Sequence, residues 1–307
     1  MPYHPGRWHV ALARQESSRG ATRILSSSSS QQTPPTEGDP APAAAAARVH
    51  ALDATLFDHV LSQTSRGARR SLLAAQRAIA SAYFPYVYLE IGSHLGGSIQ
   101  PHLLDPRCEK IVSIDPRPTE QPDDRSPGYV AHYEDNSTER MLELLRQVSP
   151  EADEKIVCYT ADASEVIEQL AEHRPQLAFI DGEHTNRAVR SDFDACRTAL
   201  RDRGLVLFHD FGIVRRGIRE ICRQLKDQGV AFTRLKLEST LFAICFEPAL
   251  VDSDPYLSRF VVRGEGFWLR YEMKWRAGRC LPRVLVRQWI AWRKRVHDRA
   301  FDKAGKR

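Results

Sequence analysis

Residues 86–98 read YVYLEIGSHLGGS, an apolar run that passes directly into a loop of glycine and serine. A short apolar run bounded by glycine predicts a buried β-strand, and the glycines allow the following backbone to approach a ligand closely. A helix that starts after the loop would offer its free N–H groups to the same ligand. Gly92 and Gly96 are separated by three residues and Gly97 follows directly, which differs from the G-x-G-x-x-G fingerprint of dinucleotide-binding proteins. The segment therefore predicts a ligand-binding loop that is poorly suited to a pyrophosphate.

Apolar runs of similar length recur along the chain. We expect further strands at 110–114, 155–158, 177–180, 205–208, 231–235 and 241–246. Helix-like segments lie at 138–147, 164–173, 187–201 and 214–228, and residues 50–83 also read as helical with a break near Gly67. Strands that alternate with helices form parallel sheets, whereas only a short turn separates the last two strands. The predicted fold is α/β: a doubly wound, mostly parallel Rossmann-like sheet with an antiparallel edge hairpin, plus helical N- and C-terminal extensions.

The composition is that of a globular protein without a disulfide framework. Of the 307 residues 42% are hydrophobic and 27% charged, and the formal net charge is +5. The six cysteines lie at least 23 positions apart, which excludes paired zinc-binding spacing and indicates reduced thiols. No apolar run approaches the ~18 residues of a membrane-spanning helix. We therefore expect a cytoplasmic protein.

Three regions differ in composition. Residues 1–48 are of low complexity and are expected to form a disordered leader, although the arginines of the first 30 residues leave an organelle transit peptide as the alternative. Residues 49–250 hold the predicted α/β domain, with its core at 83–246. Residues 251–307 are expected to form a basic, tryptophan-rich helical tail, because positions 263–307 contain 14 Lys or Arg against four acids.

Acidic side chains follow the first three predicted strands. The first strand is predicted at 86–91. Glu90 lies near its end, Asp115 follows the second strand and Asp162 follows the third. A carboxylate at the end of the second strand can accept hydrogen bonds from both hydroxyls of a ribose, and Asp162 would lie where an adenine amino group is expected. Glu90 would repel a pyrophosphate but suits a cationic or amino-bearing ligand. Each acid alone could instead cap a helix.

Two pairs of acid and histidine follow the fourth and fifth predicted strands. Residues 179–184 read FIDGEH and residues 205–210 read LVLFHD. If these strands are neighbours, Asp181 and Asp210 converge at the carboxyl edge of the sheet, where open α/β sheets bind ligands. Two carboxylates with one or two imidazoles suit a divalent ion such as Mg²⁺ or Mn²⁺. The alternative is that both aspartates cap helices or turns and that His184 is a surface residue.

The series EIGSHLGGS, SIDP, TADA, FIDGEH and LVLFHD resembles class I S-adenosylmethionine-dependent methyltransferases, in the branch of macrocin-type sugar O-methyltransferases and cephalosporin-hydroxylase-like proteins. The resemblance covers about residues 83–246. It implies an S-adenosylmethionine site formed by Glu90, Gly92, Ser93, Gly96, Ser98, Asp115 and Asp162. It also implies that Asp181 and Asp210 bind Mg²⁺ or another divalent metal, and that Asp181 and His184 are catalytic, with His184 as the base. His209 stands where some relatives have an acid, and it is the candidate for the third protein ligand.

The implied function is metal-assisted O-methylation of a small polyhydroxylated acceptor such as a sugar. A sulfonium methyl is already a strong electrophile, so the protein must mainly align the acceptor oxygen and exclude water. A base or a metal lowers the pKa of the acceptor hydroxyl. Two alternatives stay open: a hydroxylase-like or NAD-dependent enzyme on the same scaffold, and a non-catalytic cofactor-binding protein that acts through its basic tail. The absent dinucleotide fingerprint argues against NAD, and the intact acid and histidine pairs argue against loss of catalysis.

The tail separates apolar from basic side chains on a predicted helix. Its apolar stripe consists of Leu281, Val284, Leu285, Trp289, Trp292 and Val296. A helix packed on the body, a contact of residues 266–307 with an anionic membrane surface, and a nucleic-acid contact all fit this pattern, with nucleic acid the least favoured. The expected partners are thus a small-molecule acceptor, an anionic membrane that would make the protein peripheral, and further copies of the chain in a homo-oligomer.

Overall fold

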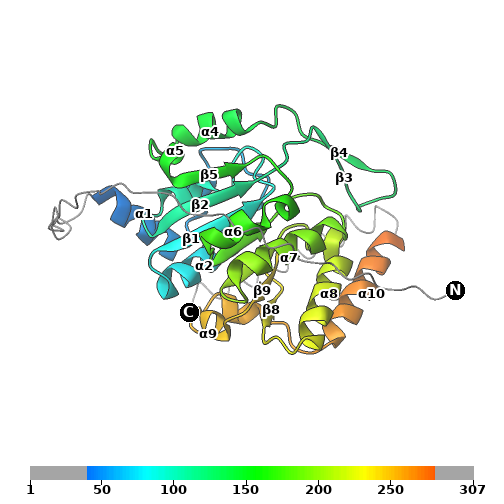
Figure 1. The fold of residues 1–307 in the computed structure, drawn as a ribbon. Coiled ribbons are helices and arrows are strands. Elements are labelled where there is room, and N and C mark those ends of the chain that lie inside the picture. The colour runs from blue at the N-terminus through cyan, green and yellow to red at the C-terminus, as the bar shows by residue number, and fades with distance from the viewer. Residues whose placement is uncertain (1–39, 281–307) are drawn as a thin grey trace, which may run out of the picture. The chain divides into compact units, whose positions relative to one another are not determined.

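A computed structural model describes residues 40–280 of the chain (Figure 1). Most of the predicted leader and the apolar stripe of the tail lie outside the described residues. The described part contains a seven-stranded sheet in the order β5-β2-β1-β6-β7-β9-β8. Its strands are β1 (Tyr86–Ile91), β2 (Cys108–Ile114), β5 (Ile156–Tyr159), β6 (Leu177–Ile180), β7 (Leu205–Phe208), β8 (Thr233–Leu235) and β9 (Phe242–Cys245). A separate antiparallel hairpin consists of β3 (Glu120–Pro122) and β4 (Val130–His132).

The sheet has the predicted mixture of directions. Strands β5, β2, β1, β6 and β7 are parallel to one another, whereas β9 is antiparallel to both β7 and β8. The order reverses between β1 and β6, as it does in doubly wound folds. The predicted fold class is therefore confirmed.

Helices cover both faces of the sheet. They are α1 (Pro40–His50), α2 (Arg66–Ala82), α3 (Gln100–Leu104), α4 (Thr138–Arg146), α5 (Ala152–Lys155), α6 (Ile167–His173), α7 (Ala188–Leu200), α8 (Phe211–Asp227), α9 (Pro248–Asp252) and α10 (Gly266–Cys280). Short 3-10 helices are η1 (Ala54–Phe57), η2 (Ala163–Glu165) and η3 (Leu257–Phe260). Successive side chains of a strand point to opposite faces, so Tyr86 and Tyr88 pack with α2 while Val87 and Leu89 pack with α7 and α8.

The N-terminal boundary of the ordered chain differs from the prediction. Residues 40–48, assigned to the disordered leader, belong to α1, and Ala45 and Val49 of this helix are buried. The run of five alanines was interpreted as low complexity, yet alanine has the highest helix propensity of all residues. Burial of the adjoining apolar side chains adds to that propensity and orders the helix.

The predicted break near Gly67 lies elsewhere. Helix α2 begins immediately before Gly67, and Ser65 caps it by accepting a hydrogen bond of 3.2 Å from the backbone N–H of Ala68. The interruption occupies residues 58–65 instead. Residues 61–64 of this interruption line the cavity described below.

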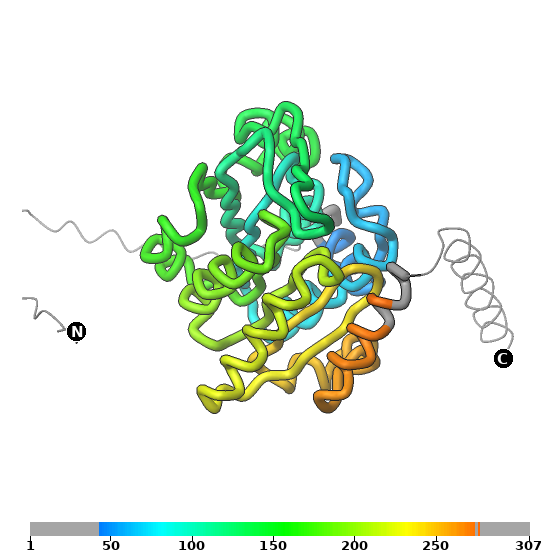
Figure 2. Tube along the Cα trace, turned by 90° about the vertical axis from the view of Figure 1, so that its right-hand side faces the viewer, coloured from blue at the N-terminus to red at the C-terminus, as the bar shows by residue number. Residues whose placement is uncertain are grey.

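The predicted boundary at residue 250 does not separate a tail from the body. Val251, Tyr256 and Leu257 are buried in the cluster on the α2 side, and Trp268 is buried in the cluster on the α8 side. In Figure 2, α10 (orange) and α8 (yellow-green) both lie in the lower part of the view. The segment from 251 to 268 therefore completes the core of the sheet domain.

The outermost strand β8 is paired on both sides. Its inner neighbour is β9, and on its outer side Leu235 forms an antiparallel bridge with Val261. The N–H of Lys236 donates to the carbonyl of Phe260 at 3.0 Å, and the N–H of Val262 donates to the carbonyl of Arg234 at 2.8 Å. The chain after η3 thus covers this edge of the sheet.

The described residues were predicted to contain no membrane-spanning helix and to have reduced cysteines. Within residues 40–280, no helix has the length and apolar character needed to cross a membrane. Five cysteines are free thiols: Cys158 is half-buried, and Cys108, Cys196, Cys222 and Cys245 are buried.

Candidate active site

The central strands end at one level, which brings the predicted site residues together. In the sheet register Ile91 pairs with both Ile114 and Ile180, and Ile180 pairs with Phe208. The residues that follow these four positions are Gly92, Asp115, Asp181 and His209. All four therefore begin loops at the same carboxyl edge, where open α/β sheets bind their ligands.

A cavity with a volume of about 390 Å³ opens at this edge. Its walls come from the loop after β1, residues 61–64, the hairpin β3–β4 and the loops after β6 and β7. The predicted site residues that line it are Gly92, Ser93, Ser98, Asp115, Asp181, His184, His209 and Asp210. Glu90, Gly96 and Asp162 are not among its lining residues.

Two of the three glycines in the loop, Gly92 and Gly96, are required for different contacts. Gly92 has a φ of +84°, and a Cβ there would lie 2.3 Å from the backbone oxygen of Asp181. Gly96 has a φ of +81°, and a Cβ there would lie 2.7 Å from a methyl group of Leu145 in helix α4. Gly92 therefore lets the first and fourth loops approach each other, whereas Gly96 lets the loop pack on the body.

Glu90 lies beneath the cavity rather than in its wall. The residue is fully buried, and its carboxyl group accepts hydrogen bonds from the hydroxyl of Tyr88, at 2.7 Å, and from the hydroxyl of Ser98. Burial outweighs these hydrogen bonds and raises the pKa of Glu90 to about 8. The group is therefore mainly protonated at neutral pH, and it supports the cavity wall through Ser98.

Asp115 joins the end of β2 to the glycine loop. One carboxylate oxygen accepts from the backbone N–H of His94 at 2.9 Å, and the other accepts from the backbone N–H of Arg117 at 2.8 Å. The Arg117 guanidinium lies 3.5 Å from the carboxylate and also donates to the His94 carbonyl. Since a carboxylate has about four acceptor positions, this one can still accept hydrogen bonds from a ligand in the cavity.

Asp162 occupies the position that the helix-cap alternative predicts. It is exposed and precedes η2, where its backbone N–H donates to the Glu165 carboxylate at 3.3 Å. The structure does not bring its side chain to the cavity.

Two imidazoles and three carboxylates cluster at the opposite wall, and all of them except Asp123 line the cavity. His184 lies between two aspartates: its Nε2 is 3.2 Å from Oδ1 of Asp181, and its Nδ1 is 3.2 Å from Oδ2 of Asp123. Asp210, in a left-handed conformation with a φ of 42°, places Oδ2 at 3.5 Å from the same Nδ1. On the other side of Asp181, His209 Nδ1 is 2.8 Å from Oδ1. Asp181 therefore links the two histidines.

Charges in this cluster control the protonation of the histidines. Burial lowers the pKa of His184, but the hydrogen bond and charge of Asp181, with two further aspartates nearby, outweigh burial and raise it to about 9. The Asp181 charge likewise overcomes burial and raises the pKa of His209. Burial opposes ionisation of Asp181 itself, yet the two imidazoles hold its pKa well below the usual range. His184 is thus protonated at neutral pH and must lose that proton before it can act as the predicted base.

The cluster has the donor set of a metal site. Ligand atoms of Asp181, His184 and His209 all lie within 4.8 Å of one another. His209 Nδ1 is buried and makes no hydrogen bond of acceptable geometry, while Nε2 of the same ring lies 3.2 Å from the hydroxyl of Thr240. An unshared imidazole nitrogen aimed at a carboxylate fits a cation between them. Two imidazoles and one carboxylate favour Mn²⁺ or another borderline ion over Mg²⁺, which prefers oxygen ligands.

This ligand set differs from the predicted one in one member. Asp181 and His209 are present as expected, but His184 takes the place predicted for Asp210. The Asp210 carboxylate lies beside this group: its Oδ2 is 3.5 Å from His184 Nδ1 and 4.0 Å from the Arg125 guanidinium, and its Oδ1 is 3.8 Å from His209 Nδ1. Asp210, which directly precedes helix α8, therefore borders the ligand group without belonging to it.

Sequence reasoning missed the contribution of the hairpin β3–β4 and of its turn. Asp123 is buried and receives two hydrogen bonds from the Arg125 side chain, at 2.9 and 2.7 Å, in addition to its contact with His184. The Arg125 guanidinium lies 4.7 Å from the ring centre of Tyr129, which also lines the cavity. The polar stretch EQPDDRSPG carries turn signals but no periodicity, so no pattern in it pointed to a site.

Comparison with known proteins places this edge in a familiar domain. Residues 89–211 match the model of a family described as a methyltransferase domain. The matched segment runs from β1 to the start of α8 and includes every predicted site residue. The resemblance to methyltransferases is therefore confirmed for this domain, while its macrocin-type branch stays a prediction.

Solved structures with low identity resemble the chain. One is the MycE methyltransferase of the mycinamycin biosynthetic pathway in complex with Mg and SAH (13% identity, TM-score 0.44). The alignment covers 64% of this chain and 54% of the MycE chain. Another is the O-methyltransferase TomG from Streptomyces achromogenes in complex with SAM (16% identity, TM-score 0.40), with 68% and 90% covered. A third is a protein from Corynebacterium glutamicum (17% identity, TM-score 0.39), with 68% and 91% covered. The sequence has no match among curated proteins.

Proposed function

We propose that the chain is an S-adenosylmethionine-dependent O-methyltransferase that acts on a small polyhydroxylated acceptor such as a sugar. The observation that carries this proposal is the cavity itself. One wall is the glycine loop with Asp115, and the opposite wall is the cluster of imidazoles and carboxylates. Both walls belong to the segment that matches a methyltransferase domain.

The wall with Asp115 suits a nucleoside. The Asp115 carboxylate is fixed by two backbone N–H groups, so its remaining acceptor positions are oriented before a ligand binds. An ordered carboxylate of this kind can accept hydrogen bonds from both ribose hydroxyls. The loop from Gly92 to Ser98 lies close to the loop that begins at Asp181, because Gly92 has no side chain to hold the two backbones apart. The rest of the cofactor would be bound along this loop.

The opposite wall suits a hydroxylated acceptor. A hydroxyl group beside Asp181 and Asp210 can donate a hydrogen bond to either carboxylate, which fixes the direction of its oxygen. His184 can remove the hydroxyl proton only after losing its own, so base catalysis by this residue increases as the pH rises toward about 9. Alternatively, Asp181, His184 and His209 would together hold a divalent ion, and such an ion would supply Lewis acidity that lowers the pKa of the hydroxyl in place of base catalysis by His184.

The hairpin gives the site its selectivity for the acceptor. Gln121, Tyr129, His132 and Tyr133 line the cavity, and none of them belongs to the seven-stranded sheet. Polar and aromatic side chains of this kind bind the hydroxyl groups and apolar faces of a sugar.

Binding and turnover together test this function. Calorimetry should show that the protein binds S-adenosylmethionine and S-adenosylhomocysteine, and that it binds NAD more weakly. Incubation with a panel of sugars and other polyols should then release S-adenosylhomocysteine with at least one acceptor. Tighter binding of NAD than of both sulfur-containing ligands would reject the proposal. Cofactor binding with no turnover across neutral sugars, nucleotide sugars and catechols would favour the non-catalytic alternative.

A further inference from the structure

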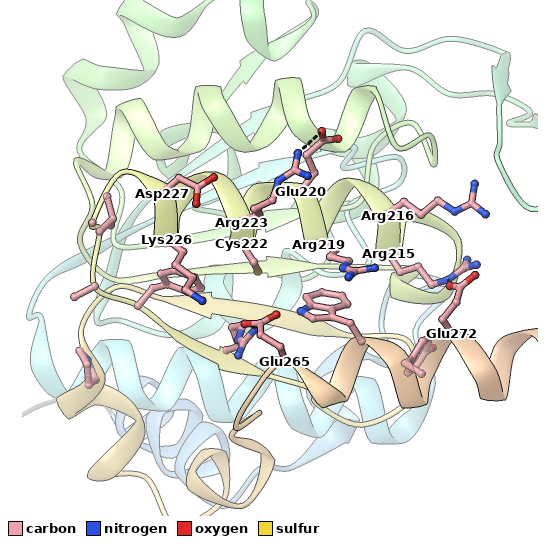
Figure 3. Close-up of a pocket in the computed structure, with 18 of the residues that line it drawn as sticks. Arg215, Arg216, Arg219, Glu220, Cys222, Arg223, Lys226, Asp227, Glu265 and Glu272 are labelled. Atoms are coloured by element: carbon pink, nitrogen blue, oxygen red, sulfur yellow. Dashed lines mark hydrogen bonds and ion pairs between the residues drawn. The ribbon is translucent and has the colours of Figure 1, made fainter.

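A second hollow lies beside helices α8 and α10, apart from the active-site cavity. It is a groove of about 1190 Å³ between α8 and α10, and none of its lining residues lines the first cavity (Figure 3). Its floor is apolar and includes Phe232, Trp268 and Tyr271. Seven Lys or Arg side chains line it against four Asp or Glu side chains. The groove therefore joins an apolar floor to a positively charged rim.

Three of the cations on α8 are not neutralised within the described residues. Arg215 pairs with Glu272, Arg223 with Glu220 and Arg234 with Glu265. By contrast, residues 40–280 contain no ion-pair partner for the exposed side chains of Arg216, Arg219 and Lys226. Figure 3 shows Arg219 and Lys226 reaching into the groove and Arg216 extending away from it.

The neighbouring helix α10 also exposes apolar side chains. Leu269 and Met273, one helical turn apart, are 64% and 55% exposed. Arg276, whose side chain is 75% exposed, lines the groove on the same helix. Helices α8 and α10 pack on the same face of the sheet, since Phe211 and Trp268 share one core cluster with ring centres 6.0 Å apart. Their outer surfaces therefore face the same way.

We propose that the outer surface of α8 and α10 binds an anionic phospholipid membrane. Arg216, Arg219 and Lys226 would contact lipid phosphates, while Leu269 and Met273 would enter the boundary between headgroups and acyl chains. Free cations beside exposed large apolar side chains are the combination that peripheral membrane proteins use. The cationic residues at 281–307 in the sequence add to the same attraction.

Two other partners fit this surface less well. A nucleic acid would neutralise the cations, but its phosphate backbone offers nothing apolar to Leu269 and Met273. A symmetric contact with a second copy would bring the unpaired cations of both copies together, and these like charges would repel each other. A bilayer of anionic lipids satisfies both kinds of side chain at once.

Vesicle flotation of the full chain tests the proposal. The protein should float with vesicles of phosphatidylcholine and phosphatidylserine at low salt, and not with pure phosphatidylcholine or at high salt. The variant R216Q/R219Q/K226Q and the variant L269S/M273S should each lower the partition coefficient about tenfold or more. The matched control is R66Q/R140Q/R174Q, which removes the same charge from exposed arginines of α2, α4 and the end of α6. It should keep most of the binding.

Other results would overturn the proposal. Absence of flotation with phosphatidylserine vesicles at low salt would reject it, and so would equal losses in the control and the surface variants. Binding that neither surface variant changes would assign the attraction to residues outside this face. Retention of duplex DNA without flotation would identify a nucleic-acid surface, and a dimer by light scattering that L269S/M273S dissociates would identify a contact between copies. Because all substituted residues are exposed, unchanged melting temperatures should show that every variant is folded.

Discussion

Asp123 Oδ2 lies 3.2 Å from Nδ1 of His184, although 61 positions separate the two residues in the sequence. Asp123 comes from the turn that follows β3, whereas His184 follows β6. The hairpin thus supplies the carboxylate that fixes one side of the imidazole, while Asp181 fixes the other. A group that orients a histidine in this way controls both its tautomer and its pKa.

Replacing Asp123 should therefore impair methyl transfer without impairing cofactor binding. We expect D123A to lower turnover by about 10- to 100-fold, because the His184 ring loses one of its two fixed contacts. D123N should restore much of the rate and move the acidic limb of the pH–rate profile to lower pH, since one negative charge beside the imidazole is gone. E120Q, on the exposed part of the same hairpin, is the control. Wild-type kinetics of D123A would contradict a positioning role.

Asp115 and Asp162 should differ sharply in their effect on cofactor affinity. Losing a buried, charged hydrogen-bond partner costs roughly 1.5–3 kcal/mol, so D115A should bind S-adenosylmethionine about tenfold or more weakly. D162A should stay within about twofold of wild type, because this side chain is exposed and does not line the cavity. Calorimetry on both variants decides between these positions. A large loss in D162A would restore the predicted contact with adenine.

Divalent metal should bind more tightly as the pH rises. Asp181, His184 and His209 form the candidate ligand group, and a histidine must lose its proton before it coordinates a cation. Since the pKa of His184 is raised to about 9, Mn²⁺ affinity should increase from about pH 6 to about pH 9. Electron paramagnetic resonance of Mn²⁺ measures this directly. H209A should abolish the signal change and the exposed control H59A should not; equal binding by both would remove the cluster from consideration as a metal site.

Glu90 should make the folded state less stable at high pH. Its pKa is raised from an ordinary value of 4.5 to about 8 in the fold, so between these values the unfolded chain binds fewer protons than the folded one. Stability therefore falls as the pH rises through this range and levels off above it. E90Q removes the ionisable group, and its unfolding free energy should exceed that of wild type above about pH 8. Urea unfolding at several pH values tests this, with E109Q on the exposed part of β2 as control.

Gly92 and Gly128 provide a matched test of the close approach between loops. Both have a positive φ, but a Cβ at Gly92 would clash with the Asp181 backbone, whereas one at Gly128 meets nothing within 4 Å. G128A should cost only about 1 kcal/mol, the ordinary penalty of this conformation. G92A should destabilise the protein clearly more and weaken cofactor binding, as thermal unfolding and calorimetry can measure. Equal costs would mean that the two loops can separate freely.

The sequence predicted the sheet well because strand signals are local. Strands β1, β6 and β7 begin and end at the predicted residues, since each is a short apolar run bounded by polar or glycine residues. The positions of Asp181 and His209 followed from the same runs, because residues that directly follow aligned parallel strands must meet. Local patterns therefore located the edge of the site and two members of its cluster.

Contacts that depend on tertiary packing could not be predicted in this way. Asp123 gains its role only when the hairpin folds over the sheet edge, and nothing in its neighbouring residues records that contact. Which of His184 and Asp210 completes the ligand group depends on side-chain positions that the residue pattern does not record. The alanines of α1 and the segment from 251 to 268 were assigned by composition, but burial against distant elements decides their structure.

The covered edge at β8 restricts how copies of this chain can associate. Many proteins assemble by β-augmentation, in which an outer strand of one molecule pairs with that of another and continues the sheet. Here the carbonyl of Arg234 and the N–H of Lys236 already bond to residues 260–262 of the same chain. A second copy could not extend the sheet at β8 without first displacing that segment, together with its connection to α10. Self-association of this protein would therefore have to use its helices, its loops or the opposite edge at β5.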